Sequence, residues 1–197
     1  IWDVPINGKP LVFGNLSDAV PDASSLVDFK GWVDEQFDPG ITWNDLDWIR
    51  DNWPGKLIIK GILDPEDARQ AIGAGADAIV VSNHGGRQLD TSPSTISVLP
   101  AIADAVGDRV DVLLDGGIRR GTDVMKALAF GAKAVLIGRP ILWGLTVNGV
   151  EGVAGVVEAA GHQVDDTFGA DFHGAGDGDH GALALERGGS GRIVHLD

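Results

Sequence analysis

The chain has 197 residues, of which 44% are hydrophobic and 22% are charged, a size and balance typical of a soluble globular protein with one substantial core. A net charge of −14 opposes sequence-independent binding to nucleic acid, and the lack of cysteine excludes disulfides, thiolate catalysis and zinc binding through sulfur. No apolar run approaches the ~20 residues that cross a membrane, and the first residues lack the form of a secretory signal. We therefore expect no transmembrane segment and a cytoplasmic location.

Strand and helix patterns alternate along most of the chain. Residues 1–40 contain scattered proline, glycine and aspartate with little periodicity, which predicts an irregular loop segment. Apolar residues near helical spacing predict a helix from Trp43 to Trp53, which ends at Pro54-Gly55. Further helices are predicted to begin at Asp64, Ser92 and Gly121, and Pro100 is expected to kink or divide the second of these. Short apolar runs predict strands at 56–62, 78–82, 110–114 and 134–137.

Two junctions between a helix and a strand repeat. The segments Gly75–Val81 and Gly131–Ile137 share a glycine, then an alanine, then a β run. Regular alternation of helices with continuous apolar strands indicates parallel β/α units with both faces of the sheet covered. A closed (β/α)8 TIM barrel typically needs about 250 residues, so residues 41–158 predict about four β/α units, half of such a barrel. Four strands leave two edges that need a partner, either a missing half-barrel or a second copy.

A histidine and an arginine follow the second strand, in the run Val80-Val81-Ser82-Asn83-His84-Gly85-Gly86-Arg87. A neutral imidazole can accept a proton near working pH, and a guanidinium fork can hold a carboxylate in two parallel hydrogen bonds. His84 and Arg87 therefore suit abstraction of a proton beside a carboxylate. An isolated His-x-x-Arg is more often a loop histidine beside a surface arginine, so this interpretation depends on the neighbouring loops.

The loops after the last two strands carry glycines and arginines. They read Asp115-Gly116-Gly117-Ile118-Arg119-Arg120-Gly121 and Gly138-Arg139-Pro140. Glycines let backbone N–H groups approach a phosphate, arginines neutralise it, and barrels commonly bind phosphate after strands seven and eight. Simple turn chemistry could explain either loop alone. The two adjacent loops together predict a phosphate site.

The run Ser82–Asp90, together with Ile59-Lys60-Gly61 and the two glycine-arginine loops, resembles the FMN-dependent α-hydroxy-acid oxidases and dehydrogenases. This family includes lactate and mandelate dehydrogenases and glycolate oxidase. The resemblance extends from about Gln36 to Glu158 and implies the C-terminal half of the family's TIM barrel, with FMN as cofactor. It implies an oxidoreductase, a flavoprotein that oxidises a small L-2-hydroxy acid to the 2-oxo acid.

The resemblance also implies a role for each matching residue. His84 would be the catalytic base, and Arg87 would anchor the substrate carboxylate. Lys60 would stabilise negative charge on the reduced flavin, because a fixed cation favours charge that develops beside it, and Ser82 would lie near the ring. Asp115 would bind the ribityl hydroxyls. The phosphate end of the cofactor would be held by Gly117, Arg119, Gly138 and Arg139.

Subfamily and location stay open within the resemblance. Residues 43–56 are most similar to the lactate- and mandelate-type dehydrogenases, whereas residues 91–96 and the Asp115 loop are closer to the oxidases. The electron acceptor and the particular 2-hydroxy acid are therefore not fixed. Residues 1–40 fit the family's long loop that covers the active site and in some members meets the membrane, which would add peripheral membrane association.

Two features depart from the family. The chain has no tyrosine, whereas the family uses tyrosines near substrate and flavin, supplied by the first half of the barrel. Residues 159–197 form a Gly-, Asp- and His-rich tract that cannot offset its ordering entropy by burial, so we predict a disordered tail and no metal site. One alternative is therefore a catalytically incomplete half-barrel that binds FMN or phosphate without turnover. Another, a barrel enzyme of the inosine-monophosphate-dehydrogenase type, would need a cysteine that the chain lacks.

Overall fold

The computed structural model describes residues 26–168 and 183–186, and the chain divides into two compact units, residues 1–42 and residues 43–197. In the first unit, the described residues include helix α2 (Leu26–Glu35), in which Lys30 and Asp34 form an ion pair one turn apart. The prediction of an irregular segment is wrong for this stretch, because apolar residues at positions 26, 29 and 33 do recur at helical spacing.

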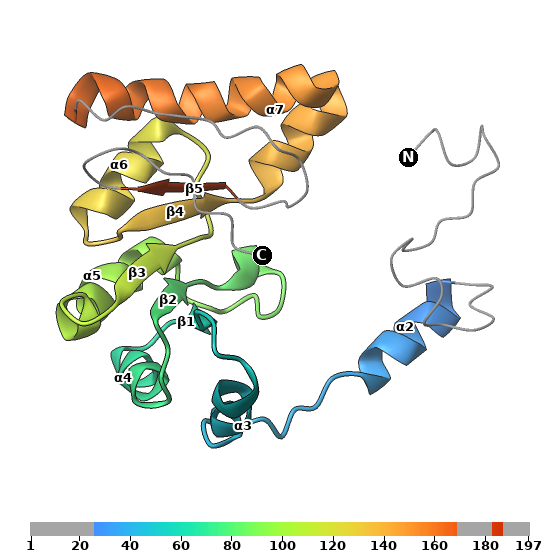
Figure 1. Cartoon of the computed structure of the whole chain (residues 1–197). Helices are drawn as coiled ribbons and strands as arrows, with labels where there is room; N and C mark the ends of the chain where they lie inside the picture. The colour runs from blue at the N-terminus through green and yellow to red at the C-terminus, as the bar shows by residue number, and fades with distance from the viewer. Residues whose placement is uncertain (1–25, 169–182, 187–197) are drawn as a thin grey trace. The chain divides into compact units, whose positions relative to one another are not determined.

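The second unit is built on a five-stranded sheet in the order β1-β2-β3-β4-β5 (Figure 1). Strands β1 to β4 run parallel, as predicted, whereas β5 runs antiparallel to β4. The strands are β1 (Ile58–Ile62), β2 (Ala78–Val81), β3 (Asp111–Leu114), β4 (Ala134–Ile137) and β5 (Leu183–Glu186). The repeated β/α pattern of the sequence therefore forms the four parallel strands that it predicts.

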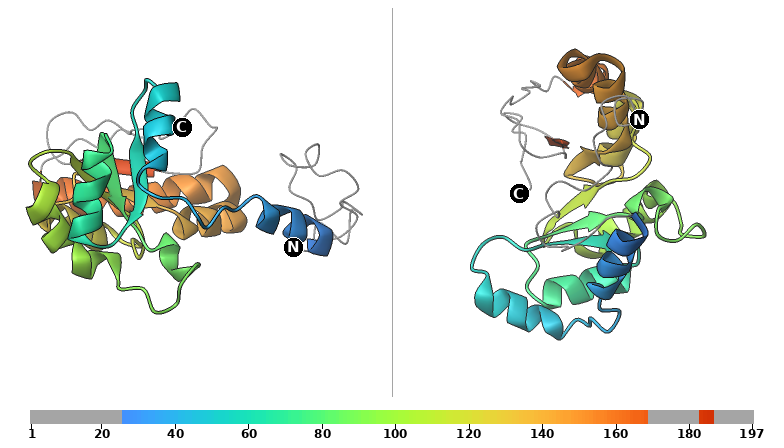
Figure 2. Two further views of the ribbon diagram at one scale, coloured as in Figure 1. Left: turned by 90° about the horizontal axis from the view of Figure 1, so that it is seen from below. Right: turned by 90° about the vertical axis from the view of Figure 1, so that its right-hand side faces the viewer.

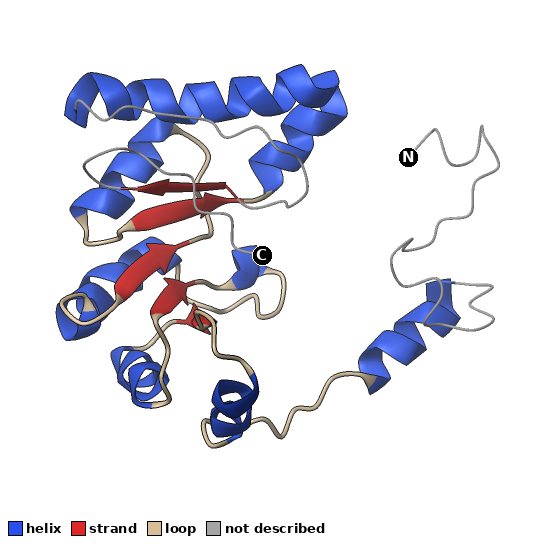
Figure 3. Cartoon of the chain, viewed as in Figure 1, coloured by secondary structure: helices blue, strands red, loops and turns tan. Residues whose placement is uncertain are grey.

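Helices follow each of the parallel strands, and α3 precedes β1 (Figure 3). They are α3 (Asp45–Asn52), α4 (Pro65–Gly73), α5 (Thr95–Val106), α6 (Gly121–Ala129) and α7 (Arg139–Phe168). Helices α4, α5 and α6 pack on the sheet, and α7 packs on α6. Asp64 caps α4, because its side chain accepts a hydrogen bond from the Glu66 backbone N–H at 2.7 Å. Helix α5 continues through Pro100, so the predicted division of that helix is wrong.

The core has two layers, one on each face of the sheet. Between the sheet and the helices lie fully buried side chains that include Ile79, Leu99, Ile102 and Leu114. The strand residues that alternate with these form a smaller cluster on the opposite face. It consists of Val80, Leu113, Ala134 and Leu136, with Ile58 packed against it. In a closed barrel this opposite face is the interior, so the strands carry apolar residues for both layers.

The C-terminal part of the chain differs from the prediction in two respects. Helix α7 passes the predicted boundary at residue 158 and ends at Phe168, and β5 lies within the predicted tail. Because β5 pairs with β4, the expectation of two open edges is wrong on that side of the sheet. Among the described residues β1 pairs with β2 alone, so the other edge has no strand partner there. Residues 169–182 and 187–197, which the disorder prediction also covers, lie outside the described residues.

Helix α7 contains a long apolar stretch, Arg139–Gly161, that by length and composition could cross a membrane. This differs from the expectation, based on the length of the apolar runs, that the chain has no transmembrane segment. Its backbone leaves helical geometry at Asn148 and at Gly149, which has φ 56° and ψ −139°. Two views show the resulting bend (Figures 1 and 2). Each of the two helical segments within the stretch is shorter than the ~20 residues that span a bilayer.

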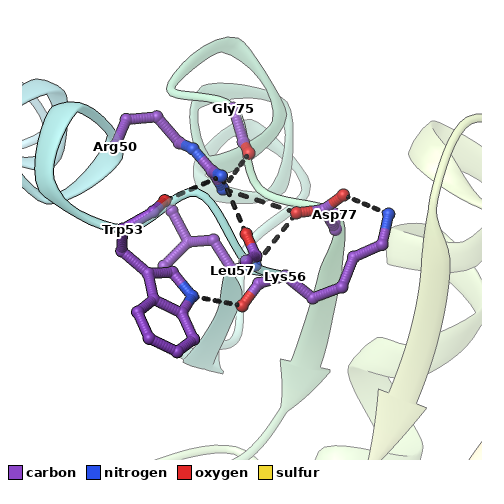
Figure 4. A network of polar contacts seen from close by, with 7 residues as sticks. Arg50, Trp53, Lys56, Leu57, Gly75 and Asp77 are labelled. Atoms are coloured by element: carbon purple, nitrogen blue, oxygen red, sulfur yellow. Dashed lines mark hydrogen bonds and ion pairs between the residues drawn. The ribbon is translucent and has the colours of Figure 1, made fainter.

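A polar network joins α3 to the amino ends of β1 and β2 (Figure 4). Arg50 donates to the carbonyl of Gly55 at 2.8 Å and to Asp77 Oδ2 at 3.4 Å. Asp77 also accepts from Lys56 Nζ at 2.7 Å and from the Leu57 backbone N–H at 2.9 Å. The hydrogen bond from Lys56, followed by that from Leu57, lowers the pKa of Asp77 below its ordinary value of 3.8. The network lies at the end of the strands opposite to the predicted site.

Candidate active site

The carboxyl ends of the four parallel strands bring the predicted site residues to one cavity of about 320 Å³. Eight of the nine predicted residues line it: Lys60, His84, Arg87, Asp115, Gly117, Arg119, Gly138 and Arg139. The ninth, Ser82, is buried beside the cavity and accepts a hydrogen bond from Lys60. Because parallel strands end at the same side of a sheet, residues up to 79 positions apart in the sequence meet there.

The turn after β2 holds His84 in an uncommon backbone conformation. His84 has φ 54°, and Gly85 and Gly86 have φ 67° and 72°, so three consecutive residues occupy the left-handed region. The Ser82 hydroxyl accepts from the His84 backbone N–H at 3.1 Å, and Asn83 Oδ1 accepts from Gly85 N–H at 3.0 Å. These bonds stabilise a turn that a histidine adopts at a cost of about 1–3 kcal/mol. Such strain is characteristic of functional turns.

His84 and Arg87 contact each other directly, with Arg87 Nη1 3.3 Å from His84 Nε2. A guanidinium group has donors and no acceptor, so in this contact Nε2 must supply a lone pair. The contact is therefore a hydrogen bond only for the tautomer that carries its proton on Nδ1 and leaves a lone pair on Nε2, the atom that a base would use. Both residues are exposed and line the cavity.

Lys60, from β1, lies between Ser82 and Asp115. Its Nζ atom is 2.8 Å from Ser82 Oγ and 2.8 Å from Asp115 Oδ2. The other carboxylate oxygen, Asp115 Oδ1, is buried and has no hydrogen-bond partner among the described residues. A buried acceptor normally has a partner, so Oδ1 is suited to a hydroxyl donor of a bound ligand.

The two glycine-arginine loops lie side by side at the cavity. A Cβ atom added at Gly117 or at Gly138 would meet nothing within 4 Å among the described residues, so each backbone borders open space. Arg119 is positioned by Asp123, whose Oδ2 accepts from the backbone N–H groups of both Arg119 and Arg120 at 3.2 Å. The accessible backbone N–H groups at the glycines and the guanidinium groups of two arginines together form a set of hydrogen-bond donors that fits a phosphate group.

The pattern of residues did not predict one feature of this site. Arg139 Nη2 donates to the carbonyl oxygen of Gly85 at 2.8 Å, linking the start of α7 to the His84 turn. The two residues are 54 positions apart, so no local pattern could indicate the contact. Asn83 was also missed, although an asparagine two positions before a pair of glycines is a turn-forming signal.

Comparison with known proteins gives consistent results. Residues 9–170 match the family described as FMN-dependent dehydrogenase. Over 157 residues, the chain is 55% identical to an L-lactate dehydrogenase of Caulobacter vibrioides, a match that covers 80% of the chain and 41% of that protein. An L-lactate dehydrogenase of Chromohalobacter salexigens is 52% identical, with 80% of the chain and 40% of that protein covered.

Solved structures agree with these relatives. A mandelate oxidase variant with a monooxide FMN adduct is 48% identical, with a TM-score of 0.62, over 66% of the chain and 41% of that protein. A monotopic membrane protein, (S)-mandelate dehydrogenase, is 44% identical, with a TM-score of 0.69, over 76% of the chain and 39% of that protein. The chain thus spans about two-fifths of the length of these proteins. The predicted family, its cofactor FMN and the partial TIM-barrel fold are confirmed, and the chain belongs to the FMN-dependent dehydrogenase family.

Proposed function

We propose that the chain provides the FMN site and the acid–base residues of an enzyme that oxidises a small L-2-hydroxy acid to the 2-oxo acid. The observation that carries this proposal is the single cavity that brings together Lys60, His84, Arg87, Asp115, Arg119 and Arg139. The relatives named L-lactate dehydrogenase and mandelate oxidase support a hydroxy-acid substrate.

The cofactor would lie across the ends of β1, β3 and β4. Arg119, Arg139 and the backbone at Gly117 and Gly138 would hold the phosphate, while Asp115 Oδ1 would accept from a ribityl hydroxyl. When bound, FMN supplies the acceptor for the two electrons that leave the substrate. Lys60, already fixed by Ser82 and Asp115, would place its positive charge beside the flavin ring.

Arg87 and His84 would act in sequence on the substrate. The substrate carboxylate would take the donors of the Arg87 guanidinium in a bidentate pair, which is stronger than the contact between that guanidinium and the imidazole. This exchange would leave Nε2 of His84 without its present donor and able to accept a proton from the substrate. The same arginine would thus bind the carboxylate and free the base.

A half-barrel that binds FMN without turnover is the second candidate function. It is favoured by the β1 edge, which has no strand partner among the described residues, and by the absence of tyrosine from the sequence. We propose that full activity requires an amino-terminal half-barrel that pairs along this edge. A second copy could cover the same edge but would add no tyrosine.

The location of the protein stays a prediction. We propose a cytoplasmic protein that associates peripherally with a membrane. Three exposed apolar side chains of α7 support the membrane association: Leu142, Trp143 and Leu145. The relative described as a monotopic membrane protein supports it as well. Two of these side chains, Leu142 and Trp143, line the cavity, so a partner half-barrel is the competing explanation for their exposure.

The test is flavin reduction under anaerobic conditions, with the chain combined with the amino-terminal part of the Caulobacter vibrioides enzyme. We expect L-lactate or mandelate to bleach the visible flavin absorbance. The His84→Gln variant should keep bound FMN and reduce it about 10²- to 10⁴-fold more slowly, because only proton transfer is lost. Lys133→Gln, at an exposed residue that is not among those lining the cavity, is the control. Normal reduction by the His84 variant would contradict the role of His84 as base.

A further inference from the structure

The contact between Arg139 and Gly85 joins two parts of the site that have separate roles in the proposed function. Arg139 begins α7, directly after β4 and within the proposed phosphate site, whereas Gly85 follows His84 in the turn after β2. Nη2 of Arg139 donates to the Gly85 carbonyl oxygen at 2.8 Å. The arginine also lines two cavities of this region, the one lined by His84 and a second of about 380 Å³ that Gly85 and Gly86 also line.

The turn is closed by backbone hydrogen bonds from Gly86 N–H to the Asn83 carbonyl at 3.0 Å and from Arg87 N–H to the His84 carbonyl at 3.4 Å. Ser82 Oγ and Asn83 Oδ1 fix the backbone N–H groups of His84 and Gly85, respectively. The Gly85 carbonyl is held from outside the turn, by Arg139, so this contact ties the turn to the start of α7. His84 occupies a left-handed conformation that is unfavourable for a residue with a side chain, so loss of a restraint should let the turn relax and redirect the imidazole.

The guanidinium has capacity for a second partner. It carries five N–H donors in a planar fork, and Gly85 is its only hydrogen-bond partner among the described residues. We propose that Arg139 is a positioning residue for His84, which holds the Gly85 carbonyl with one arm and a bound phosphate with the others. Phosphate occupancy thereby fixes the turn that carries the base. This inference rests on the proposed function, because it takes the glycine-arginine loops as the phosphate site.

The first test uses the His84 imidazole as a reporter. Nuclear magnetic resonance of histidine-labelled protein is recorded for the wild-type chain, Arg139→Ala and Arg119→Ala, with the His84 signal assigned by His84→Gln. Without ligand, we expect the His84 signal to move in Arg139→Ala and to stay in Arg119→Ala, because Arg119 lines the same cavity but forms no hydrogen bond with the turn among the described residues. Unmoved His84 signals in both variants would overturn the proposal.

Inorganic phosphate is the ligand probe, because a flavin ring would itself alter the resonance of a nearby imidazole. In the wild-type chain, phosphate should shift the His84 signal saturably, and in Arg139→Ala it should not. Arg119→Ala should need more phosphate to reach the same shifted position. Phosphate that binds wild type and leaves His84 unaffected would overturn the coupling. If neither phosphate nor FMN binds, the proposed cofactor site fails, while the ligand-free comparison still decides whether Arg139 positions His84.

The reciprocal test starts from the turn. A Cβ atom at Gly85 would lie 2.8 Å from Arg139 Nη2, whereas one at Gly86 would meet nothing within 4 Å among the described residues. Both glycines have positive φ, so alanine strains the backbone at either position. We expect Gly85→Ala to weaken phosphate binding at least about tenfold more than the matched Gly86→Ala, because coupling between two sites is reciprocal. Equal affinities in the two variants would overturn the proposal.

If one variant does not fold, the remaining variants still test the proposal. Circular dichroism establishes folding for each protein. If Arg139→Ala is unfolded, Arg139→Lys takes its place, because an ammonium keeps the charge for phosphate but lacks the planar fork that donates in two directions. Arg139→Lys should retain phosphate binding and show a displaced His84 signal. A wild-type His84 signal in Arg139→Lys would contradict the positioning role.

Discussion

Lys60 and Asp115 form an ion pair at 2.8 Å that leaves one buried carboxylate oxygen, Oδ1, with no hydrogen-bond partner among the described residues. The two oxygens of the Asp115 carboxylate therefore differ in their surroundings. Oδ2 pairs with the lysine, and in the proposed function Oδ1 would accept from a ribityl hydroxyl of the cofactor. The side chain of Asp115 is 17% exposed, so an unmet acceptor there costs more than one in water.

We predict that Asp115→Asn weakens FMN binding and leaves the binding of inorganic phosphate unchanged. The substitution removes the charge that pairs with Lys60 and turns one acceptor into a donor. A hydrogen bond to a charged group contributes about 1.5–3 kcal/mol, so FMN affinity should fall roughly 10- to 100-fold. Flavin fluorescence titration measures the loss. An equal loss of phosphate affinity would show that Asp115 acts on the whole site and not on the ribityl chain.

We predict that Arg87→Lys raises the substrate concentration needed for half-maximal flavin reduction, because a point charge cannot reproduce a bidentate pair with the substrate carboxylate. The measurement is anaerobic reduction in the chain combined with the amino-terminal part of the Caulobacter vibrioides enzyme. Lys126→Arg, an exposed cation of α6, provides the control. Unchanged substrate dependence in the Arg87 variant would argue against carboxylate binding at this position.

We predict that part of the chain's stability is lost on acidification through Asp77. The pKa of Asp77 is lowered in the folded chain, so its contribution is present above about pH 4 and is lost as the pH falls from there through the folded pKa. Asp77→Asn should unfold at lower urea than wild type near neutral pH, and the difference should shrink below the folded pKa. Asp104→Asn, at an exposed carboxylate of α5, is the control. A difference independent of pH would contradict the ionic contribution.

The sequence predicted the parallel strands and most of the site because both depend on local patterns. β2 and β4 appear as short apolar runs, each preceded by a glycine with positive φ, Gly75 or Gly131. Helix α5 continues through Pro100 because the flanking Leu99 and Ile102 are fully buried, and their packing outweighs one lost backbone hydrogen bond.

Features that depend on distant contacts were not predictable in this way. β5 forms by pairing with β4, in a tract whose composition favours disorder when it is considered alone. The contact between Arg139 and Gly85 similarly depends on the parallel strands bringing two distant loops together. Helix α2 was missed for a different reason, since Gly31 and the aspartates obscured a helical spacing that the sequence does contain.

We predict that removing residues 169–197, and with them β5, strengthens association with an amino-terminal half-barrel. β5 occupies the edge of β4 in antiparallel orientation, whereas a closed TIM barrel has a parallel strand at each edge. Titration of the amino-terminal part of the Caulobacter vibrioides enzyme into the full and shortened chains, followed by recovered activity, measures the effect. Identical titration curves would show that β5 does not compete. A higher concentration of the chain alone should change its oligomeric state and leave its activity low.

The most direct test of the cofactor site is a comparison of FMN with riboflavin, which differs from it by the phosphate. Equilibrium titration by flavin fluorescence is made on the wild-type chain and on the Arg119→Ala, Arg139→Ala double variant. If the two glycine-arginine loops form the phosphate site, wild type binds FMN at least about tenfold more tightly than riboflavin, and the double variant binds both with similar weak affinity. Equal affinity of wild type for the two flavins, or undiminished FMN binding by the double variant, would contradict this account.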